Sequence, residues 1–212
     1  MHEFDLINNY FFKIAKKNKS ALNLNDDVFF DKKRGVVISV DTYNIGTHFY
    51  DFKSPDLVIK KILRSSISDL ICKGVIPKFY FISGSGNKKT FTKNNLYKIS
   101  KSLKSEQNKF NIDLCGGDTT FSSKLSFTIT SLGYSNKIIY RNKAKLNDDI
   151  YVTGNLGDSY LGLKALTNKA KLKNKDKSYI NFPKQMLNLY VRIFCQHSGI
   201  FMATNACHFT AR

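Results

Sequence analysis

Residues 36–41 read Val36-Val37-Ile38-Ser39-Val40-Asp41, a run of β-branched aliphatic side chains that ends in a carboxylate. A short continuous run of this kind is typical of a strand buried within a sheet. We therefore predict a strand over Val36 to Val40 that ends abruptly at Asp41 and delivers this carboxylate to the edge of the sheet. The chain is predicted to be built around such a sheet, with polar functional side chains where its strands end.

The segment that follows this strand predicts a long helix. Ser54 and Pro55 are typical of a helix start, since serine caps the first turn and proline fits the first helical position. Gly74 and Pro77 mark its end. The helix is apolar on most faces, so we expect it to be central. Asp69 falls on a narrow stripe of this helix, where a carboxylate either caps something or binds something.

The other segments alternate between strands and helices. The pattern predicts helices over 6–16 and 96–110 and strands over 78–83, 112–115 and 125–134. The strand over 112–115 is expected to break into Gly116-Gly117-Asp118, where the glycines allow the backbone to approach a ligand closely. This order indicates a mixed α/β protein with a boundary near Asn147, beyond which a strand, a turn and a helix over 158–170 open a second unit.

The composition excludes two broad classes of protein. The chain has 212 residues, 42% of them hydrophobic, which is too apolar for intrinsic disorder, and no apolar run is long enough to cross a membrane. Its formal charge of +18 comes mainly from dispersed lysines, 29 against five arginines, whereas proteins that read a DNA groove favour arginine. We expect no nucleic-acid partner, but a lysine-rich nucleic-acid-binding module stays open as an alternative of another class.

The four cysteines do not indicate a zinc site. Cys72, Cys115, Cys195 and Cys207 have no CxxC spacing and no clustered histidines beside them. No secretory pattern opens the sequence, so we expect free thiols in a reducing cytoplasm.

Fourteen aspartates stand against only two glutamates, which makes each aspartate informative. Asp41, Asp69 and Asp118 each follow or lie on an apolar element, and Asp26-Asp27 adds a further pair of carboxylates. Converging like charges are costly unless a hard divalent cation neutralises them, and Mg²⁺ held by a few carboxylates usually accompanies nucleotide phosphates. The aspartates together favour a magnesium and nucleotide site, while each one taken singly also fits a turn or a strand end.

Two further motifs carry weaker signals. The segment 83–89 is rich in Gly, Ser and Lys but lacks the spacing of a phosphate-binding loop, so we predict a flexible turn. His48 follows the Asp41 strand after one short loop. A single histidine is more often structural, yet this position makes His48 the best candidate for contact with a substrate.

Six short motifs, in order along the chain, together resemble the thiamine-monophosphate kinase family. They are Asn25-Asp26-Asp27, Ser39-Val40-Asp41 with Gly46-Thr47-His48-Phe49, Ser68-Asp69-Leu70 with Gly74 and Pro77, Gly116-Gly117-Asp118-Thr119-Thr120, Arg141 with Ala144-Lys145, and Ile150-Tyr151-Val152-Thr153-Gly154 with Leu156-Gly157-Asp158-Ser159. The family belongs to a superfamily of ATP-binding enzymes that includes aminoimidazole ribonucleotide synthetase. The resemblance implies an α+β N-terminal ATP- and Mg²⁺-binding domain over 1–146, which pairs into a homodimer through its sheet, and an incomplete α/β C-terminal domain over 147–212.

The resemblance also implies an activity, the transfer of the ATP γ-phosphoryl group to thiamine monophosphate to give thiamine diphosphate. It implies roles for the matching residues: Mg²⁺ held by Asp27, Ser39, Val40, Asp41, Asp69 and Asp118, ATP contacted by Gly117, Asp118 and Arg141, and thiamine monophosphate contacted by His48. Val40 stands where the family has threonine, so only its backbone carbonyl could bind a metal. Asn25 likewise replaces a family glycine.

The family's second domain carries an Asp-x-Ser-Asp-Gly motif of metal-binding and catalytic carboxylates, which this sequence lacks. We therefore assign no catalytic residue and expect a chain truncated in its second domain, with low stability and weak or absent turnover. Another ATP-using member of the superfamily, and a non-catalytic remnant that folds and dimerises, stay open as alternatives.

Overall fold

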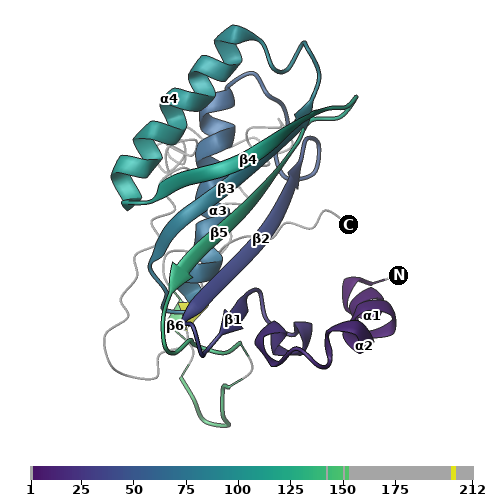
Figure 1. Cartoon of the computed structure of the whole chain (residues 1–212), viewed down its shortest axis with the longest axis vertical. Helices are drawn as coiled ribbons and strands as arrows, with labels where there is room; N and C mark the ends of the chain where they lie inside the picture. Colours follow the sequence, from purple (N-terminus) through teal and green to yellow (C-terminus); the bar gives the residue numbers. More distant parts are fainter. Residues whose placement is uncertain (1, 142, 150, 153–201, 204–212) are drawn as a thin grey trace, which may run out of the picture. The chain divides into compact units, whose positions relative to one another are not determined.

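The computed structural model describes residues 2–141, 143–149, 151–152 and 202–203 (Figure 1). The chain divides into two compact units, Met1–Asp148 and Asp149–Arg212. In the described part of the second unit, β6 (Tyr151–Val152) pairs in parallel with β7 (Met202–Ala203). The helix predicted over 158–170 lies outside the described residues, and the assignment of functional domains to 1–146 and 147–212 stays a prediction.

The first unit is built on a five-stranded sheet. Its strands are β1 (Phe29–Asp31), β2 (Val36–Asn44), β3 (Pro77–Gly86), β4 (Asp113–Phe121) and β5 (Ser126–Tyr134), in the order β1-β2-β5-β3-β4. β3 and β4 are parallel, and the other neighbours in the sheet are antiparallel. This mixed sheet, combined with helices on one face, confirms the predicted α/β class.

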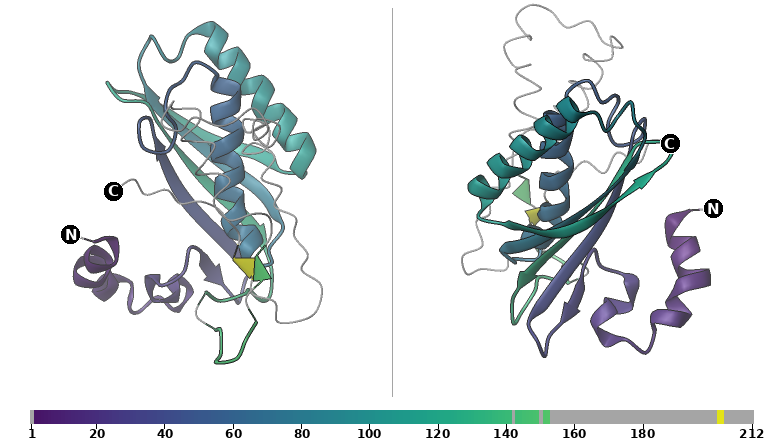
Figure 2. Two further views of the ribbon diagram at one scale, coloured as in Figure 1. Left: turned by 180° about the vertical axis from the view of Figure 1, so that it is seen from behind. Right: turned by 45° about the horizontal axis from the view of Figure 1, so that its top comes forward.

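Helix α3 (Pro55–Cys72) lies across one face of the sheet, and α4 (Lys93–Phe110) packs beside it (Figures 1 and 2). α3 begins and ends as predicted, with Pro55 at its first position and Gly74 just after its C-cap at φ +74°, a conformation that suits glycine. Its fully buried side chains include Ile59, Ile62, Leu63, Ile67 and Leu70. The prediction of a central helix is confirmed, and this packing turns Asp69 of the same helix toward the interior.

Strand β2 runs further than the sequence predicted. It continues past Asp41 to Asn44, because Thr42 and Tyr43 keep pairing with Thr128 and Phe127 of β5. The prediction that the strand ends at Asp41 is therefore wrong. Asp41 is held within a paired strand, a more rigid position than a strand end.

Strands β3 and β4 also continue through segments that were predicted to be loops. β4 does not break at its glycines, because Gly117 pairs with Ile82 of β3 so closely that a Cβ there would overlap the Ile82 carbonyl. β3 extends to Gly86, so the first half of the predicted flexible turn is strand. The turn itself starts at Asn87, whose carbonyl accepts the Thr90 N–H at 3.0 Å.

The N-terminal segment is helical, as predicted, but it begins earlier and changes its winding. α1 (Glu3–Leu6) passes into a π-helical turn, η1 (Ile7–Phe11), and then into α2 (Phe12–Ala15). A 3₁₀-helix, η2 (Lys19–Leu24), leads from there toward β1. None of the helices that the structure describes is long and apolar enough to span a membrane.

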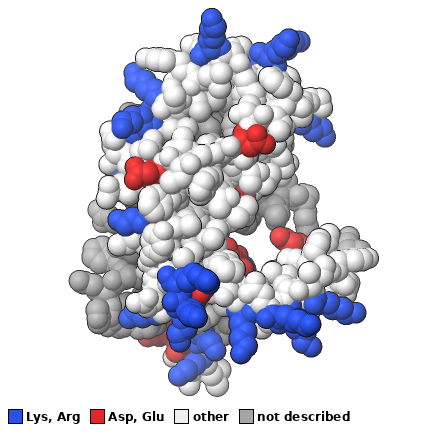
Figure 3. All heavy atoms as spheres, in the orientation of Figure 1, with Lys and Arg blue, Asp and Glu red and all other residues white. Residues whose placement is uncertain are grey.

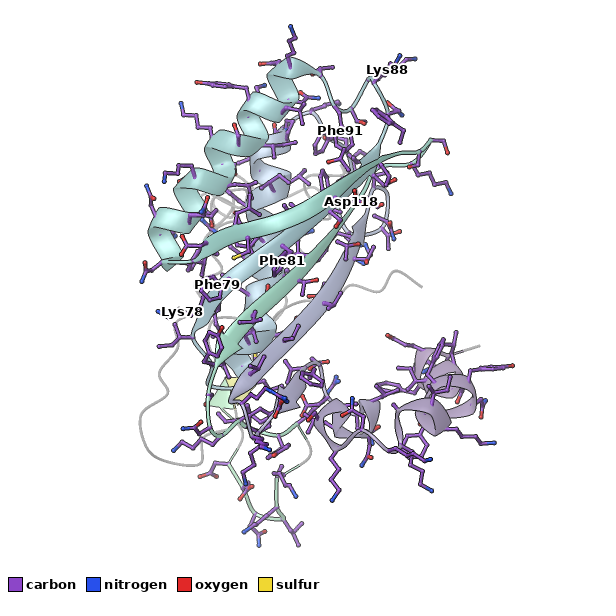
Figure 4. The ribbon with its side chains drawn as sticks, in the orientation of Figure 1. Lys78, Phe79, Phe81, Lys88, Phe91 and Asp118 are labelled. Carbon is purple, nitrogen blue, oxygen red and sulfur yellow. The ribbon has the colours of Figure 1, made fainter. Side chains whose placement is uncertain are left out.

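The sheet face opposite α3 carries exposed apolar side chains (Figure 4). Val40 is 60% exposed, Phe81 is 40% exposed and Tyr134 is 55% exposed. Val40, Thr130 and Phe81 pair in one row across β2, β5 and β3, so they share this face. Within the described part of the first unit, no helix packs on these residues.

Candidate functional site

A cluster of polar side chains lies between β2 and α3. Ser39, Asp41 and Tyr43 alternate along β2, so all three project from the sheet face that α3 covers. Ser39 Oγ donates a hydrogen bond to Asp69 Oδ2 at 3.2 Å, and the Tyr43 hydroxyl donates one to Asp41 Oδ2 at 3.2 Å. The fold thus brings together two of the predicted carboxylates, one from a strand and one from a helix.

Burial and mutual repulsion raise the pKa of Asp69 to about 8. The largest cause is the removal of this carboxyl from water, followed by the negative charges of Asp41 and Asp27. Burial, and then the charge of Asp41, raise the pKa of Tyr43 well above its ordinary range, so its hydroxyl remains a donor. Without a cation, Asp69 therefore keeps a proton at neutral pH, and a divalent cation that neutralised the cluster would displace this proton.

The raised pKa of Asp69 predicts a pH-dependent stability in the absence of divalent cations. Between its ordinary value of 3.8 and about 8, the folded chain binds more protons at Asp69 than the unfolded chain does. The free energy of unfolding should therefore decrease as the pH rises from about 5 to about 8. Asp69→Asn should weaken this dependence, because asparagine does not titrate. Urea unfolding of both chains in a chelator, at the two ends of this pH range, measures the difference; equal pH dependence in both would contradict the prediction.

A second group of predicted residues meets at the exposed side of this cluster. Arg141 Nη1 donates to Asp27 Oδ1 at 3.0 Å, and the backbone N–H of Arg141 donates to Asp26 Oδ2 at 3.2 Å. Because the charge of Asp27 also raises the pKa of Asp69, the two groups are electrostatically linked. A predicted ATP contact and a predicted metal ligand therefore lie side by side, although they are far apart in sequence.

Asp118 does not join this cluster. In the sheet it pairs with Ser83, which pairs with Thr128, which in turn pairs with Thr42. Since Thr42 follows Asp41 along β2, Asp118 projects from the opposite face to Asp41, and two strands lie between β2 and β4. Asp118 is exposed on the edge strand, where its Oδ1 accepts the Thr119 N–H at 2.8 Å (Figure 4). Among the described residues, Asp118 therefore does not converge with Asp27, Asp41 and Asp69.

The remaining predicted site residues lie around the cluster. His48 Nδ1 accepts the Asn44 N–H at 2.9 Å, and its ring packs edge-on against Tyr43 with centroids 5.6 Å apart. Val40 points to the opposite sheet face from Asp41, which leaves its backbone carbonyl as its sole metal donor. Gly117 has no room for a side chain, since a Cβ would overlap the Ile82 carbonyl.

The described residues contain no group of three or more His, Cys, Asp or Glu side chains spaced to hold a metal ion. Ser39, Asp41, Asp69 and Asp27 are instead arranged as a hydrogen-bonded and charge-coupled set, with oxygen donors of the kind that Mg²⁺ prefers. The predicted metal ligands therefore stay a prediction, supported in part by this geometry.

The roles of Asp26 and Lys73 were not predicted from the sequence. Their side chains form a buried ion pair, with 4% and 5% of each exposed. The Asp-Asp motif predicted Asp26 only as one of a pair of carboxylates near a cation site, not as an anchor. Lys73 stands next to the glycine that ends α3, and no local pattern indicates a partner so far away in the sequence.

The chain is similar to known proteins in sequence. The family described as "AIR synthase related protein, N-terminal domain" matches residues 23–135. Thiamine-monophosphate kinase of Haemophilus influenzae is 37% identical over 169 residues, which cover 77% of this chain and 51% of that protein. The enzyme of the same name from Leptospira interrogans is 34% identical over 142 residues, 66% of this chain and 46% of that protein. The chain spans about half the length of the curated relatives it matches.

Solved structures show the same fold. A structure of AaThiL complexed with AMPPCP and TMP has a TM-score of 0.70 and 25% identity, covering 84% of this chain and 57% of that one. Thiamine monophosphate kinase from Aquifex aeolicus has a TM-score of 0.67 and 22% identity, covering 91% and 62%. These similarities confirm the resemblance to thiamine-monophosphate kinases that the motifs predicted. By its fold and by the match over residues 23–135, the chain belongs to the AIR synthase related protein family through that family's N-terminal domain.

Proposed function

We propose that the chain supplies the nucleotide-binding half of a thiamine-monophosphate kinase, which transfers the γ-phosphoryl group of ATP to thiamine monophosphate. The observation that carries this proposal is the buried carboxylate cluster of Asp41 and Asp69, linked through Asp27 to Arg141. Support also comes from the similar AaThiL, which was solved with the ATP analogue AMPPCP and with TMP.

The chemistry explains why these residue types are needed. Both substrates are polyanions, so a site for them must offset their repulsion and hold the attacking and leaving oxygens in line. Asp27, Asp41 and Asp69 would hold Mg²⁺, which neutralises phosphate oxygens when it is bound. The planar guanidinium of Arg141 suits a phosphate, and its Nη1 donates to Asp27 Oδ1 at 3.0 Å. Ser39, the Val40 carbonyl, Gly117 and His48 keep the roles that the resemblance implies. Asp118 projects from the opposite sheet face to Asp41, so it is not proposed to share a metal ion with Asp41 and Asp69 of the same chain.

A homodimer is part of the proposal. The open sheet face with Val40, Phe81 and Tyr134 offers the apolar surface that such a contact would bury. We also propose a cytoplasmic location, in agreement with the free thiol of Cys115.

Basic side chains offer a further aid to binding anions. Figure 3 shows Lys and Arg side chains gathered at the lower end of the molecular face that it displays, over the N-terminal segment and the nearby turns. Such a field would draw in ATP and thiamine monophosphate, and it is also the feature that a nucleic-acid-binding module would use. The two functions differ in their dependence on Mg²⁺.

Calorimetric titration with AMPPCP, with and without Mg²⁺, tests the proposal. We expect binding that requires Mg²⁺ and that then permits thiamine monophosphate to bind. Titration with a DNA oligonucleotide at two salt concentrations tests the rival class, which predicts binding that weakens steeply with salt and ignores Mg²⁺. Binding of the oligonucleotide in this manner, together with no binding of AMPPCP, would overturn the kinase proposal.

A further inference from the structure

Lys73 is a buried lysine to which the proposed chemistry gives no role. Its side chain is 5% exposed and forms an ion pair with Asp26, whose side chain is 4% exposed. Lysines are almost never fully buried unless they are paired, so this pair is a built feature of the fold. Lys73 also forms the C-cap of α3, where a positive charge interacts favourably with the helix dipole.

The Asp26 carboxylate gathers three donors from three segments of the chain. Besides the Lys73 ammonium, its Oδ1 accepts the N–H of Asp27 at 2.9 Å and its Oδ2 accepts the N–H of Arg141 at 3.2 Å. The backbone carbonyl of Lys73 accepts the N–H of Ile139 at 3.0 Å. One ion pair thus ties the end of α3 to the segment before β1 and to the segment after β5.

These two segments carry the residues that would meet the nucleotide and its metal ion. Arg141 and Asp27 bind each other at 3.0 Å, yet their side chains are 53% and 45% exposed. Exposed ion pairs of this kind contribute little to holding a geometry by themselves, because water screens the charges and long side chains lose entropy on pairing. The backbone N–H groups of Asp27 and Arg141 instead donate to a carboxylate whose side chain is only 4% exposed and is paired with Lys73. Hydrogen bonds to an ionised acceptor are strong, so these two bonds are the stronger constraint on where Arg141 and Asp27 lie.

We propose that Lys73 is a positioning residue which, through Asp26, holds Arg141 and Asp27 in the geometry that binds ATP with its metal ion. This inference rests on the proposed function, because it concerns the same nucleotide site. Lys73 touches neither ligand. Its part is to hold the Asp26 carboxylate in place, so that both backbone N–H groups point at it. Loss of such an outer partner typically weakens binding about tenfold or more.

The test compares Lys73→Met with Lys78→Met in the full chain. Lys78 lies exposed on β3, so its substitution makes the same change of charge away from the Asp26 anchor (Figure 4). Lys73→Met should weaken Mg²⁺-AMPPCP binding about tenfold in calorimetry, while Lys78→Met should leave it unchanged. Hydrogen exchange at the Arg141 amide should accelerate in Lys73→Met. The Ile139 amide serves as the reference, because its partner is the backbone carbonyl of residue 73, which every variant retains.

A double-variant cycle separates positioning from general damage. In a chain that carries both Arg141→Ala and Asp27→Asn, Lys73→Met should cause no additional loss of AMPPCP affinity, because both residues that it positions are already replaced. A further tenfold loss there, or unchanged affinity and unchanged Arg141 exchange in Lys73→Met alone, would overturn the inference. If Lys73→Met does not fold, Lys73→Met combined with Asp26→Asn removes both buried charges and is judged by the same measurements.

If the proposed function is wrong, the AMPPCP affinities of the variants will differ from the parent chain in another way. If Arg141→Ala and Asp27→Asn both bind Mg²⁺-AMPPCP like the parent chain, the nucleotide site itself is misassigned and the positioning role falls with it. If those two variants lose affinity and Lys73→Met does not, the site stands and the positioning role alone is wrong.

Discussion

Replacing Asp69 with asparagine is expected to weaken Mg²⁺-dependent AMPPCP binding by about 100-fold, without a loss of stability. Removing an outer partner of a metal ligand already costs up to about 100-fold in affinity, and Asp69 is proposed to be a ligand itself. Burial and the charge of Asp41 raise its pKa to about 8, so the chain without metal already carries a neutral carboxyl there. Asparagine has the same shape, is also neutral and can still accept the Ser39 hydrogen bond. The substitution should therefore separate metal binding from folding.

Asp56→Asn is the matched control for this substitution. Asp56 lies in the first turn of the same helix, remote from the cluster at the other end. It should retain AMPPCP affinity and lose at most about 1 kcal/mol of stability through the helix dipole. Calorimetry for affinity and urea unfolding in chelator for stability give both readouts. Affinity lost equally in Asp56→Asn and Asp69→Asn, or retained in both, would remove the metal role of Asp69.

Local sequence patterns predicted the elements that depend on local physics. The start of β2, the extent of β5 and both ends of α3 follow from β-branched runs, alternation, proline and glycine. The continuation of β4 through Gly116 and Gly117 could not be predicted from such patterns, because glycine usually marks a turn. Its extended course depends on pairing with β3, whose backbone at Ile82 approaches Gly117 too closely for any larger residue.

The same distinction separates the site residues that could be predicted from those that could not. Asp41 and Asp69 were found because each interrupts an apolar pattern on its own element. The position of Asp118 depends on strand order and on which face it occupies, and both of these are set by long-range pairing. The partners of Lys73 and Glu106 are likewise distant in sequence, at Asp26 and Arg64, so no local window contains both members of either pair.

The pair between Arg64 and Glu106 joins the two long helices of the first unit. Arg64 Nε lies 2.6 Å from Glu106 Oε2, and its Nη2 lies 2.8 Å from Oε1, a bidentate geometry. The two side chains are 11% and 1% exposed, and the guanidinium also lies over the Phe110 ring, 5.7 Å from its centroid. Removing one member of such a pair leaves the other charge buried without compensation, which costs more than the pair itself contributes.

Glu106→Gln is therefore expected to lower the free energy of unfolding by about 3 kcal/mol. This value is at the lower end of the range for breaking a buried ion pair, because the glutamine keeps one acceptor oxygen.

Glu3→Gln is the matched control, since Glu3 is the only other glutamate of the chain and lies exposed in α1. Its unfolding should stay within about 0.5 kcal/mol of the parent. The urea midpoints of the parent chain, Glu106→Gln and Glu3→Gln measure these differences in stability, when all three unfold with the same m-value. Arg64→Met combined with Glu106→Leu should recover most of the loss, because an apolar pair leaves no buried charge. Similar midpoints for Glu106→Gln and Glu3→Gln would show that the contact between α3 and α4 depends on apolar packing and not on this ion pair.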